Sequence, residues 1–348
     1  MKAAVYKGYG LPLKIEEVPN PTPKEGEVLV KVASTGICHS DLHLLSGELV
    51  GPLPNGFIIG HEIAGWVEKI GGNVKNPYGL KEGDPVLVSW IVPCGICRYC
   101  ASGKENYCKE NAKRLVGLIG INGGHAEYLT VPEIAVVPLA KNLDPYYSSP
   151  IACAYGTAYN ALKSANATSG KSIVIVGSGG VGSAAIQLAN SIGLNPIIAV
   201  DIDENKLKRA KELGATHIIN ANESDARAKV LETLEDGADI VYETKPYPDL
   251  KLSLEVVKSG GTIVVTGLGG FSTLAQIPVT LFVSRGITLI GSLGYRPRID
   301  LPELVSLASS GKIDIKKLVS YIYTPDKINE AYENLKKGLH IRAIIRWN

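Results

Sequence analysis

The pattern of apolar residues changes character near residue 150. Before that point, short apolar runs such as Val28–Val32 and Pro85–Ser89 are interrupted by Gly and Pro, which predicts an irregular, mostly β domain with long loops. After it, near-continuous runs of Val and Ile alternate with helical patterns, as in parallel strands buried on both faces. The predicted strands are Ser172–Val176, Pro196–Val200, Ile218–Asn220, Ala238–Glu243, Thr262–Gly267 and Ile287–Ser292. Six such strands alternating with helices predict a doubly wound α/β fold.

The C-terminal stretch returns to a mixed pattern. Apolar side chains recur at helical spacing between Ile328 and Leu335, with Asp326 as the expected N-cap. We expect this segment to pack on the N-terminal domain. The chain is thus predicted to form two domains, which comprise residues 1–149 with 295–348, and residues 150–294.

Composition and charge disfavour several classes of protein. The 348 residues are too many for one ordinary core, which agrees with two domains. A formal net charge of +2 argues against a nucleic-acid partner. The sequence contains no apolar run long enough for a membrane span and no apolar signal segment, so the expected location is the cytoplasm. Thiols stay reduced in that compartment, which favours metal binding over disulfides.

A glycine-rich turn follows the first predicted parallel strand. Gly177, Gly179 and Gly182 have G-x-G-x-x-G spacing, between an apolar strand and a helix that Gly193 should end. Such a turn lets the backbone approach a pyrophosphate, to which the helix N-terminus supplies amide donors. Asp201 ends the next predicted strand, where a carboxylate can bind both ribose hydroxyls and would repel a 2′-phosphate. This pattern predicts NAD, with further contacts from Gly180, Val181, Ile202 and Lys206.

Four of the six cysteines lie in one polar run. Cys94, Cys97, Cys100 and Cys108 have the spacing C-x2-C-x2-C-x7-C. Four thiolates this close satisfy a tetrahedral zinc ion without another ligand, so we predict a structural zinc site. An iron–sulfur cluster is less compatible, because the ferredoxin pattern has a shorter last spacing followed by proline. A nucleic-acid-binding zinc module is disfavoured because the run also carries acidic residues.

The two remaining cysteines, Cys38 and Cys153, lie far apart in the sequence. Taken singly, such a cysteine is usually a small core residue. Together with His61 and the adjacent Glu62, they offer the donors of an open zinc site that leaves a position for substrate. Asp41 is the candidate acceptor for the second ring nitrogen of a ligating histidine. The chain is therefore predicted to hold two zinc ions, one structural and one catalytic.

In these motifs the chain resembles the zinc-dependent alcohol dehydrogenases of the medium-chain dehydrogenase/reductase superfamily. The matching segments, in order, are GICHSDLH, GHEIAGWVEKIG, CGICRYC with Cys108, CAYGTAY, GSGGVG, VDID and IRAII. The resemblance covers nearly the whole chain and implies a GroES-like catalytic domain joined to a Rossmann coenzyme domain. It also implies reversible hydride transfer from an alcohol to NAD, giving an aldehyde or ketone. Microbial members are usually tetramers, so a homotetramer is favoured over a dimer.

The resemblance assigns roles to individual residues. The catalytic zinc ligands would be Cys38, His61 and Cys153, with Glu62 as an occasional fourth. Ser40 would take the alcohol proton, and His43 would pass it on through the nicotinamide ribose. Arg342 would contact the coenzyme pyrophosphate, and His39 stands near it, where many relatives carry arginine.

Two other functions remain open from the sequence. One is a polyol or amino-alcohol dehydrogenase of the same superfamily, although Cys153 favours the alcohol branch because polyol dehydrogenases tend to use glutamate as third ligand. The other is a non-catalytic protein that binds zinc and a nucleotide, against which the presence of Ser40 and His43 argues. Trp90 and Tyr295 are candidates for the substrate pocket.

Overall fold

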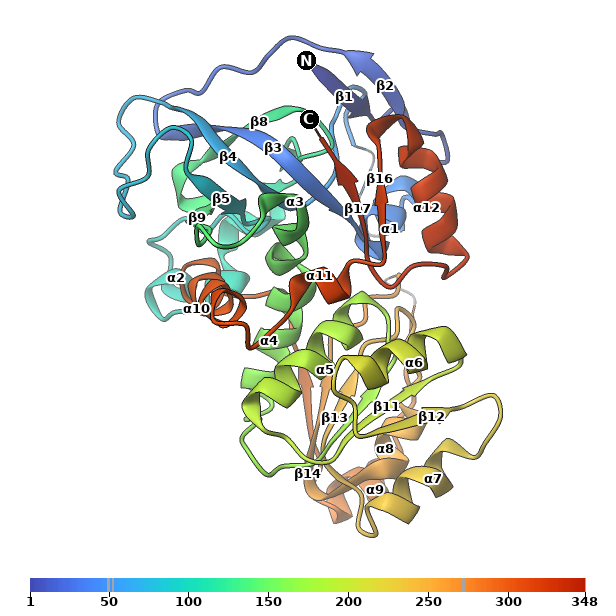
Figure 1. Cartoon of the computed structure of the whole chain (residues 1–348). Coiled ribbons are helices and arrows are strands. Elements are labelled where there is room, and N and C mark those ends of the chain that lie inside the picture. The colour runs from blue at the N-terminus through green and yellow to red at the C-terminus, as the bar shows by residue number, and fades with distance from the viewer. Residues whose placement is uncertain (49–50, 52, 271–272, 348) are drawn as a thin grey trace. The chain divides into compact units, whose positions relative to one another are not determined.

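The computed structural model describes residues 1–48, 51, 53–270 and 273–347. The chain forms two compact units, Met1–Gly156 with Gly294–Asn348, and Thr157–Leu293 (Figure 1). The first division therefore falls after Gly156 rather than after residue 149. Gly156 packs closely within this unit, since a Cβ on it would lie 2.3 Å from the ring of Tyr295, which belongs to the same unit.

A seven-stranded sheet forms the centre of the first unit. Its order is β16-β17-β3-β4-β5-β9, and β8 pairs with β3 outside this path. The long strand β3 is antiparallel to β4, β8 and β17. The C-terminal strand thus lies beside β3 (Figure 1), which confirms that the C-terminal segment packs on the N-terminal domain. The strands of this unit are β1 (Lys2–Val5), β2 (Lys14–Glu17), β3 (Glu27–Ile37), β4 (Glu62–Ile70), β5 (Pro85–Val88), β6 (Leu115–Val116), β7 (Gly120–Ile121), β8 (Tyr128–Pro132), β9 (Val136–Pro138), β16 (Tyr321–Tyr323) and β17 (Ala343–Arg346).

Short helices surround this sheet and carry much of the chemistry described below. They are α1 (His39–Ser46), α2 (Arg98–Ala101), α3 (Pro145–Ser148), α10 (Pro297–Ser309), α11 (Ile315–Leu318) and α12 (Ile328–Lys336). Helix α4 (Ala154–Ser164) spans the division between the units. Helix α12 confirms the predicted C-terminal helix, but its N-cap is Lys327 rather than Asp326, because Asp326 lies in a preceding 3-10 turn.

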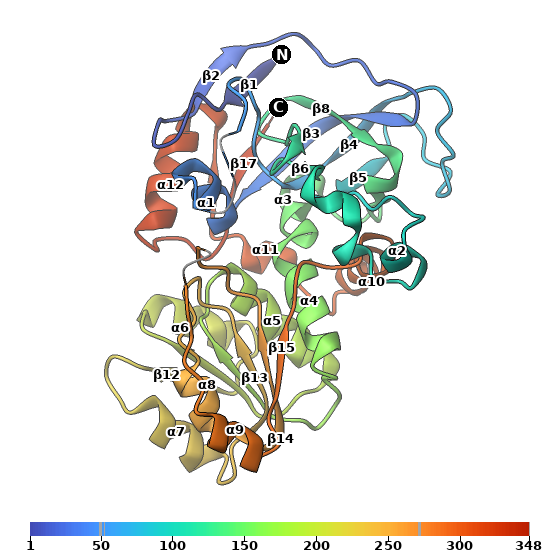
Figure 2. The same ribbon diagram turned by 180° about the vertical axis from the view of Figure 1, so that it is seen from behind.

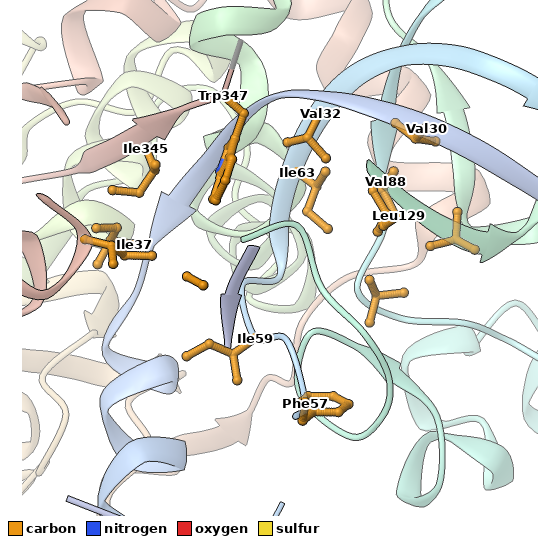
Figure 3. Close-up of a cluster of buried hydrophobic side chains, with 14 of the residues drawn as sticks. Val30, Val32, Ile37, Phe57, Ile59, Ile63, Val88, Leu129, Ile345 and Trp347 are labelled. Atoms are coloured by element: carbon orange, nitrogen blue, oxygen red, sulfur yellow. The ribbon is translucent and has the colours of Figure 1, made fainter. Parts of the chain in front are cut away.

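The core of the first unit is built from side chains on one face of neighbouring strands. Because strand residues alternate between faces, Val30 and Val32 of β3 point the same way, and Ile63 of β4 and Ile345 of β17 join them (Figure 3). Trp347, after β17, is 1% exposed in the same cluster. Burying each such side chain stabilises the fold by roughly 1.5–3 kcal/mol.

The second unit confirms the predicted doubly wound fold. Its six strands are all parallel, in the order β12-β11-β10-β13-β14-β15. Helices α5 and α6 cover one face of this sheet, in front of it in Figure 1 and behind it in Figure 2. The elements are β10 (Ile173–Val176), α5 (Gly180–Ile192), β11 (Ile197–Asp201), α6 (Glu204–Glu212), β12 (His217–Asn220), α7 (Ala226–Thr233), β13 (Ala238–Glu243), α8 (Lys251–Val256), β14 (Val257–Val265), α9 (Val279–Ser284) and β15 (Thr288–Gly291).

One strand begins earlier than expected. β14 starts at Val257 rather than Thr262, and the register with β13 shifts between Ala238 and Ile240. Gly260 has φ +73 within this stretch, a conformation that favours glycine. Gly260 and Gly261 interrupt the run of apolar residues, so the apolar pattern alone did not indicate the first half of the strand.

Candidate metal centres and coenzyme site

Four cysteine thiols come together in the polar loop that follows β5. The Sγ atoms lie 3.9 Å apart for Cys94 and Cys100, 3.6 Å for Cys97 and Cys100, and 4.0 Å for Cys97 and Cys108. A tetrahedral zinc ion with Zn–S bonds of about 2.3 Å requires Sγ–Sγ edges of about 3.8 Å. No disulfide competes, because all six cysteines are free. The thiol set therefore fits a closed, four-coordinate zinc site.

Hydrogen bonds and burial shift the pKa values of these thiols in opposite directions. Backbone N–H groups of Cys100 and Lys109 lower the pKa of the Cys97 thiol to about 6. Burial raises the pKa of the Cys100 thiol to about 12. Because thiols bind a metal only after deprotonation, zinc uptake at this cluster releases protons and weakens as the pH falls.

An ion pair anchors the cysteine loop to α10. Glu105 is 2% exposed and accepts from Arg298 Nε at 2.5 Å and from the Arg298 backbone N–H at 3.2 Å. The two views agree that α2, in the cysteine loop, lies beside α10 (Figures 1 and 2). The loop is thus held by a charged hydrogen bond as well as by its own thiol cluster.

The second group of potential metal ligands is assembled from three separate segments. Cys38 follows β3, His61 and Glu62 lie at the start of β4, and Cys153 follows a 3-10 turn. β3 and β4 are antiparallel, with Gly36 opposite Glu62, so the end of one strand meets the start of the other. One ligand atom from each of the four residues lies within 4.8 Å of all the others, and all four residues are buried.

Asp41 organises this second cluster. One of its carboxylate oxygens accepts from His61 Nδ1 at 2.9 Å, and the other accepts from the Cys38 backbone N–H at 3.0 Å. Burial alone would lower the pKa of His61, but the charge and hydrogen bond of Asp41 outweigh it and the pKa is raised. Since Nδ1 donates to Asp41, Nε2 is left for a metal, which is the usual arrangement of a ligating histidine.

The two thiols of this cluster are hydrogen-bonded to each other. The Cys153 thiol donates to Cys38, which lowers the pKa of Cys38 and raises that of Cys153. The Cys38 thiol is therefore the more readily deprotonated of the two. The Cys153 thiol must also lose its proton when the metal binds.

Glu62 lies beside the thiols and is held by Arg342. Its Oε1 accepts from Arg342 Nη1 at 2.7 Å, and that nitrogen also donates to the Ile37 carbonyl at 2.9 Å. Burial raises the pKa of Glu62 to about 8, although the charge of Arg342 acts the other way. Within the described part of the chain, Glu62 Oε2 is buried and has no partner. A Cβ on Gly36 would lie 2.0 Å from this oxygen, so a glycine leaves the room that it occupies.

These donors suit a zinc ion that keeps one position for substrate. Two sulfurs and one imidazole nitrogen are the known ligand set of catalytic zinc in alcohol dehydrogenases. The free oxygen of Glu62 adds a fourth donor to the same group. The contact between Arg342 and the coenzyme pyrophosphate stays a prediction, since within its own unit Arg342 is 5% exposed and paired with Glu62.

A second buried pair extends the network behind Asp41. His125 Nε2 and the Tyr332 hydroxyl lie 2.7 Å apart, and Tyr332 also hydrogen-bonds to Asp41. Burial lowers the pKa of His125 to about 4. The ring is confined by Gly60, where a Cβ would lie 2.7 Å from it. His125 is therefore a neutral imidazole enclosed in the core.

This enclosed histidine should make stability depend on pH. Unfolding frees His125 to bind a proton with the ordinary pKa of 6.5, whereas the folded protein resists protonation down to about pH 4. The unfolded state therefore binds more protons between these values. The contribution to the free energy of unfolding is complete above pH 6.5 and is lost as the pH falls toward 4, by about 3 kcal/mol. Denaturant titrations should show a smaller acid loss for His125→Gln than for the native protein, and equal losses would contradict this account.

Helix α1 carries the predicted proton-relay residues. Cys38 is its N-cap residue, and Ser40 Oγ lies 3.8 Å from Cys38 Sγ. His43 is one helical turn after Ser40, so the two side chains lie on the same face of the helix. His43 is buried, Ser40 is half-buried and His39 is exposed. His43 Nδ1 lies 2.6 Å from Glu48 Oε2, a partner that the sequence did not indicate.

Two aromatic residues adjoin the second cluster. The ring centroid of Trp90 lies 6.3 Å from that of His61 and 5.8 Å from that of Tyr295, edge-on in both cases. Tyr295 is completely buried, and its hydroxyl donates to the Ala152 carbonyl at 2.5 Å. Trp90 thus brings an apolar surface close to His61, while Tyr295 supports it from within the core.

The glycine-rich turn of the second unit fits a dinucleotide. Gly177 has φ +96, which makes the sharp turn after β10. A Cβ on Gly179 would meet no atom within 4 Å, so the backbone there is open to a ligand. A Cβ on Gly182 would lie 1.9 Å from the Gly177 carbonyl oxygen, so only glycine allows α5 to pack this closely. These are the three roles that glycines have in dinucleotide-binding turns.

The other coenzyme residues predicted in the second unit lie on α5, at the end of β11 and on α6. Asp201, at the end of β11, accepts from the backbone N–H of Ser178 at 2.6 Å and from that of Ile202 at 2.8 Å. Gly180 and Val181 form the first turn of α5, which Gly193 ends in a left-handed conformation as expected. Ile202 is 63% exposed and Lys206 is half-buried on α6. Asp201 is thus fixed against the turn, and its contact with a ribose stays a prediction.

The match to known families covers both units. Residues 24–141 match the family described as "Alcohol dehydrogenase GroES-like domain", and residues 180–310 match "Zinc-binding dehydrogenase". An alcohol dehydrogenase of Geobacillus stearothermophilus is 36% identical over 343 residues, which cover 97% of this chain and 96% of the relative. An NAD-dependent alcohol dehydrogenase of Sulfolobus acidocaldarius is 35% identical, with 97% of each chain covered.

Solved structures agree with the sequence relatives. Benzyl alcohol dehydrogenase from Acinetobacter calcoaceticus is 32% identical with a TM-score of 0.92, covering 100% of this chain and 99% of that one. The alcohol dehydrogenase of Aeropyrum pernix is 31% identical with a TM-score of 0.87, covering 99% and 100%. In the described ranges, the helices are too short or too polar to cross a bilayer. This chain belongs to the zinc-type alcohol dehydrogenase family of the medium-chain dehydrogenase/reductase superfamily.

Proposed function

We propose that this protein is an NAD-dependent alcohol dehydrogenase that holds one catalytic and one structural zinc ion per chain. The observation that carries the proposal is the buried cluster of Cys38, His61, Glu62 and Cys153, with Asp41 bound to His61. Bound at this cluster, zinc would supply Lewis-acid polarisation of an alcohol oxygen, and NAD would supply the acceptor for hydride. The four-cysteine loop would hold the structural ion.

The protein's own residues would bind, orient and deprotonate the alcohol. Asp41 keeps His61 in the tautomer that offers Nε2 to a metal. Ser40, beside Cys38, would accept the alcohol proton, and His43 would pass it on. Trp90 would contact the apolar part of the alcohol and exclude water from it.

A panel of alcohols tests this function and its alternatives. The purified protein should form NADH from at least one class of primary, secondary or aromatic alcohol. Turnover restricted to polyols or amino alcohols would move the protein to another branch of the superfamily. Tight NADH binding without turnover of any substrate would indicate a non-catalytic zinc and nucleotide-binding protein.

Coenzyme choice should depend on the charge of Asp201. The Asp201→Asn variant keeps the size of the side chain but removes the negative charge proposed to repel a 2′-phosphate. The ratio of the NADPH and NADH dissociation constants, measured by fluorescence titration, should fall by about tenfold or more, or about 1.4 kcal/mol. Asp203→Asn is the matched control, because Asp203 caps α6 and asparagine is an equally good cap. A native protein that prefers NADPH would contradict the assignment.

The finer features of the proposal are a cytoplasmic location and a homotetrameric assembly. The homotetramer rests on the resemblance to microbial members of the family rather than on contacts within one chain. Sedimentation velocity at several protein concentrations tests the assembly, and a monomer or dimer would require its revision.

A further inference from the structure

Two contacts join His43 to Glu48 at the C-terminal end of α1. His43 Nδ1 lies 2.6 Å from Glu48 Oε2, and the Glu48 backbone N–H donates to the His43 carbonyl at 3.0 Å. The helix ends at Gly47, which has φ 80 in the left-handed region. This turn carries the chain back over the last residues of the helix. The carboxylate of Glu48 therefore reaches the ring of His43 because of the way the helix ends.

The N-terminal segment braces this helix end. A Cβ on Gly47 would lie 2.9 Å from the ring of Tyr9, and the Gly10 backbone N–H donates to the Leu45 carbonyl at 3.0 Å. The left-handed turn and its cover hold Glu48 in place. The pair thus joins a buried ring to a carboxylate that follows a braced turn, unlike an exposed pair between two long side chains, which contributes little.

The two members of the pair differ in exposure. The side chain of His43 is 9% exposed, whereas that of Glu48 is 42% exposed. The imidazole therefore lies inside the protein while its partner reaches water. Among the described residues, Asp41 in the first turn of this helix is bonded to His61, His39 is exposed, and the ring of Tyr9 lies over Gly47.

We propose that Glu48 is a positioning residue for the proton relay: its carboxylate holds His43 in the tautomer that carries the proton on Nδ1 and leaves Nε2 as the acceptor. The inference rests on the proposed function, in which His43 receives the proton from the alcohol. Glu48 also offsets the positive charge that the ring acquires when Nε2 is protonated, as the aspartate does in a Ser-His-Asp triad. The step is a proton transfer only. Nε2 gains a proton and later releases it to water, while the Nδ1 proton stays in its bond to Glu48.

Replacing Glu48 with Gln removes the charge and keeps the size of the side chain. Turnover should fall roughly tenfold, at the low end of what a perturbed acid–base step costs. The acidic limb of the pH profile of kcat should move to lower pH, because the protonated ring has lost its neighbouring negative charge. NADH binding, KM for the alcohol and zinc content should stay within about twofold of native, because Glu48 belongs to none of the proposed ligand sets. Glu48→Asp keeps the charge and should restore the native pH profile.

A matched control and a double variant separate this role from a structural one. Glu16→Gln removes a carboxylate of similar exposure, paired with Lys7 at 2.8 Å, from the same unit. It should leave kcat and its pH profile unchanged. In a His43→Gln background, Glu48→Gln should cost nothing further, because Glu48 acts through His43.

Other results would contradict either the role of Glu48 alone or the whole proton relay. If His43→Gln is slow while Glu48→Gln behaves like Glu16→Gln, this inference fails and the relay stands. If Glu48→Gln costs as much in the His43→Gln background as in the native protein, Glu48 does not act through His43 and the inference fails. If His43→Gln itself has native rates and pH profile, the proposed relay fails and the role of Glu48 fails with it.

Discussion

Replacing Cys153 with Ala should abolish NADH formation from alcohols while the protein keeps one zinc ion per chain. The variant removes one of two sulfurs from a buried group of four donors and leaves Cys38, His61 and Glu62. Loss of even an outer partner of a metal ligand costs roughly 10–100-fold in metal affinity or activity, so loss of a ligand should cost more. The four-cysteine loop shares no ligand with this cluster and should retain its ion.

Elemental analysis under non-chelating conditions and steady-state kinetics measure these two effects together. Native protein should contain two zinc ions per chain, and Cys153→Ala should contain one. The matched variant Cys97→Ser should also contain one, but it should lose thermal stability, because a structural zinc site contributes directly to folding. Native protein with a single ion, or a Cys153→Ala protein with native turnover, would overturn the assignment of two sites.

The second large effect is expected at Ser40. Its hydroxyl lies 3.8 Å from Cys38 Sγ, on the helix turn that precedes His43. A metal can bind the alcohol oxygen, but the proton must still leave a water-poor site. Ser40→Ala should therefore reduce kcat roughly 100-fold or more, on the scale of a lost acid–base step.

The controls for Ser40 test whether the effect is chemical. Zinc content and the NADH dissociation constant should match the native values, because Ser40 belongs to neither proposed ligand set. Ser40→Thr keeps a hydroxyl and should recover most of the rate. Native kcat and an unaltered pH profile in Ser40→Ala would remove the relay from the mechanism.

Residue patterns predicted the second unit well because its strands are buried on both faces. Such strands are near-continuous apolar runs, and each is punctuated by the turn that follows it. The predicted boundaries of elements and units were less accurate where tertiary packing, rather than the apolar pattern, determines them. β14 begins at Val257 because an irregular turn continues the strand, and the first unit extends to Gly156, which packs against Tyr295.

The candidate site was predictable as a set of donors but not as a network. Cysteine and histidine side chains have few alternative roles in such motifs, so their types and spacing pointed to metal. The partners of these residues are ordinary residues whose roles depend on three-dimensional proximity. Glu48 beside His43, and Tyr332 beside His125, have no local signal because each pair is created by a helix end or by core packing. The pairing of Arg342 with Glu62 joins residues 280 positions apart, which no local pattern can reveal.

The pairing of Arg342 with Glu62 can form only late in the synthesis of the chain. A ribosome releases β3, β4 and all the proposed zinc ligands long before it releases β17, and the whole second unit is synthesised in between. Until the chain is nearly complete, the edge of β3 that β17 will cover is open, and the carboxylate of Glu62 has no guanidinium beside it. A nascent chain can gather sulfur and imidazole donors early, but Glu62 gains its guanidinium partner only at the end of translation. A metal ion captured before that moment would meet a site that still lacks the positive charge of Arg342.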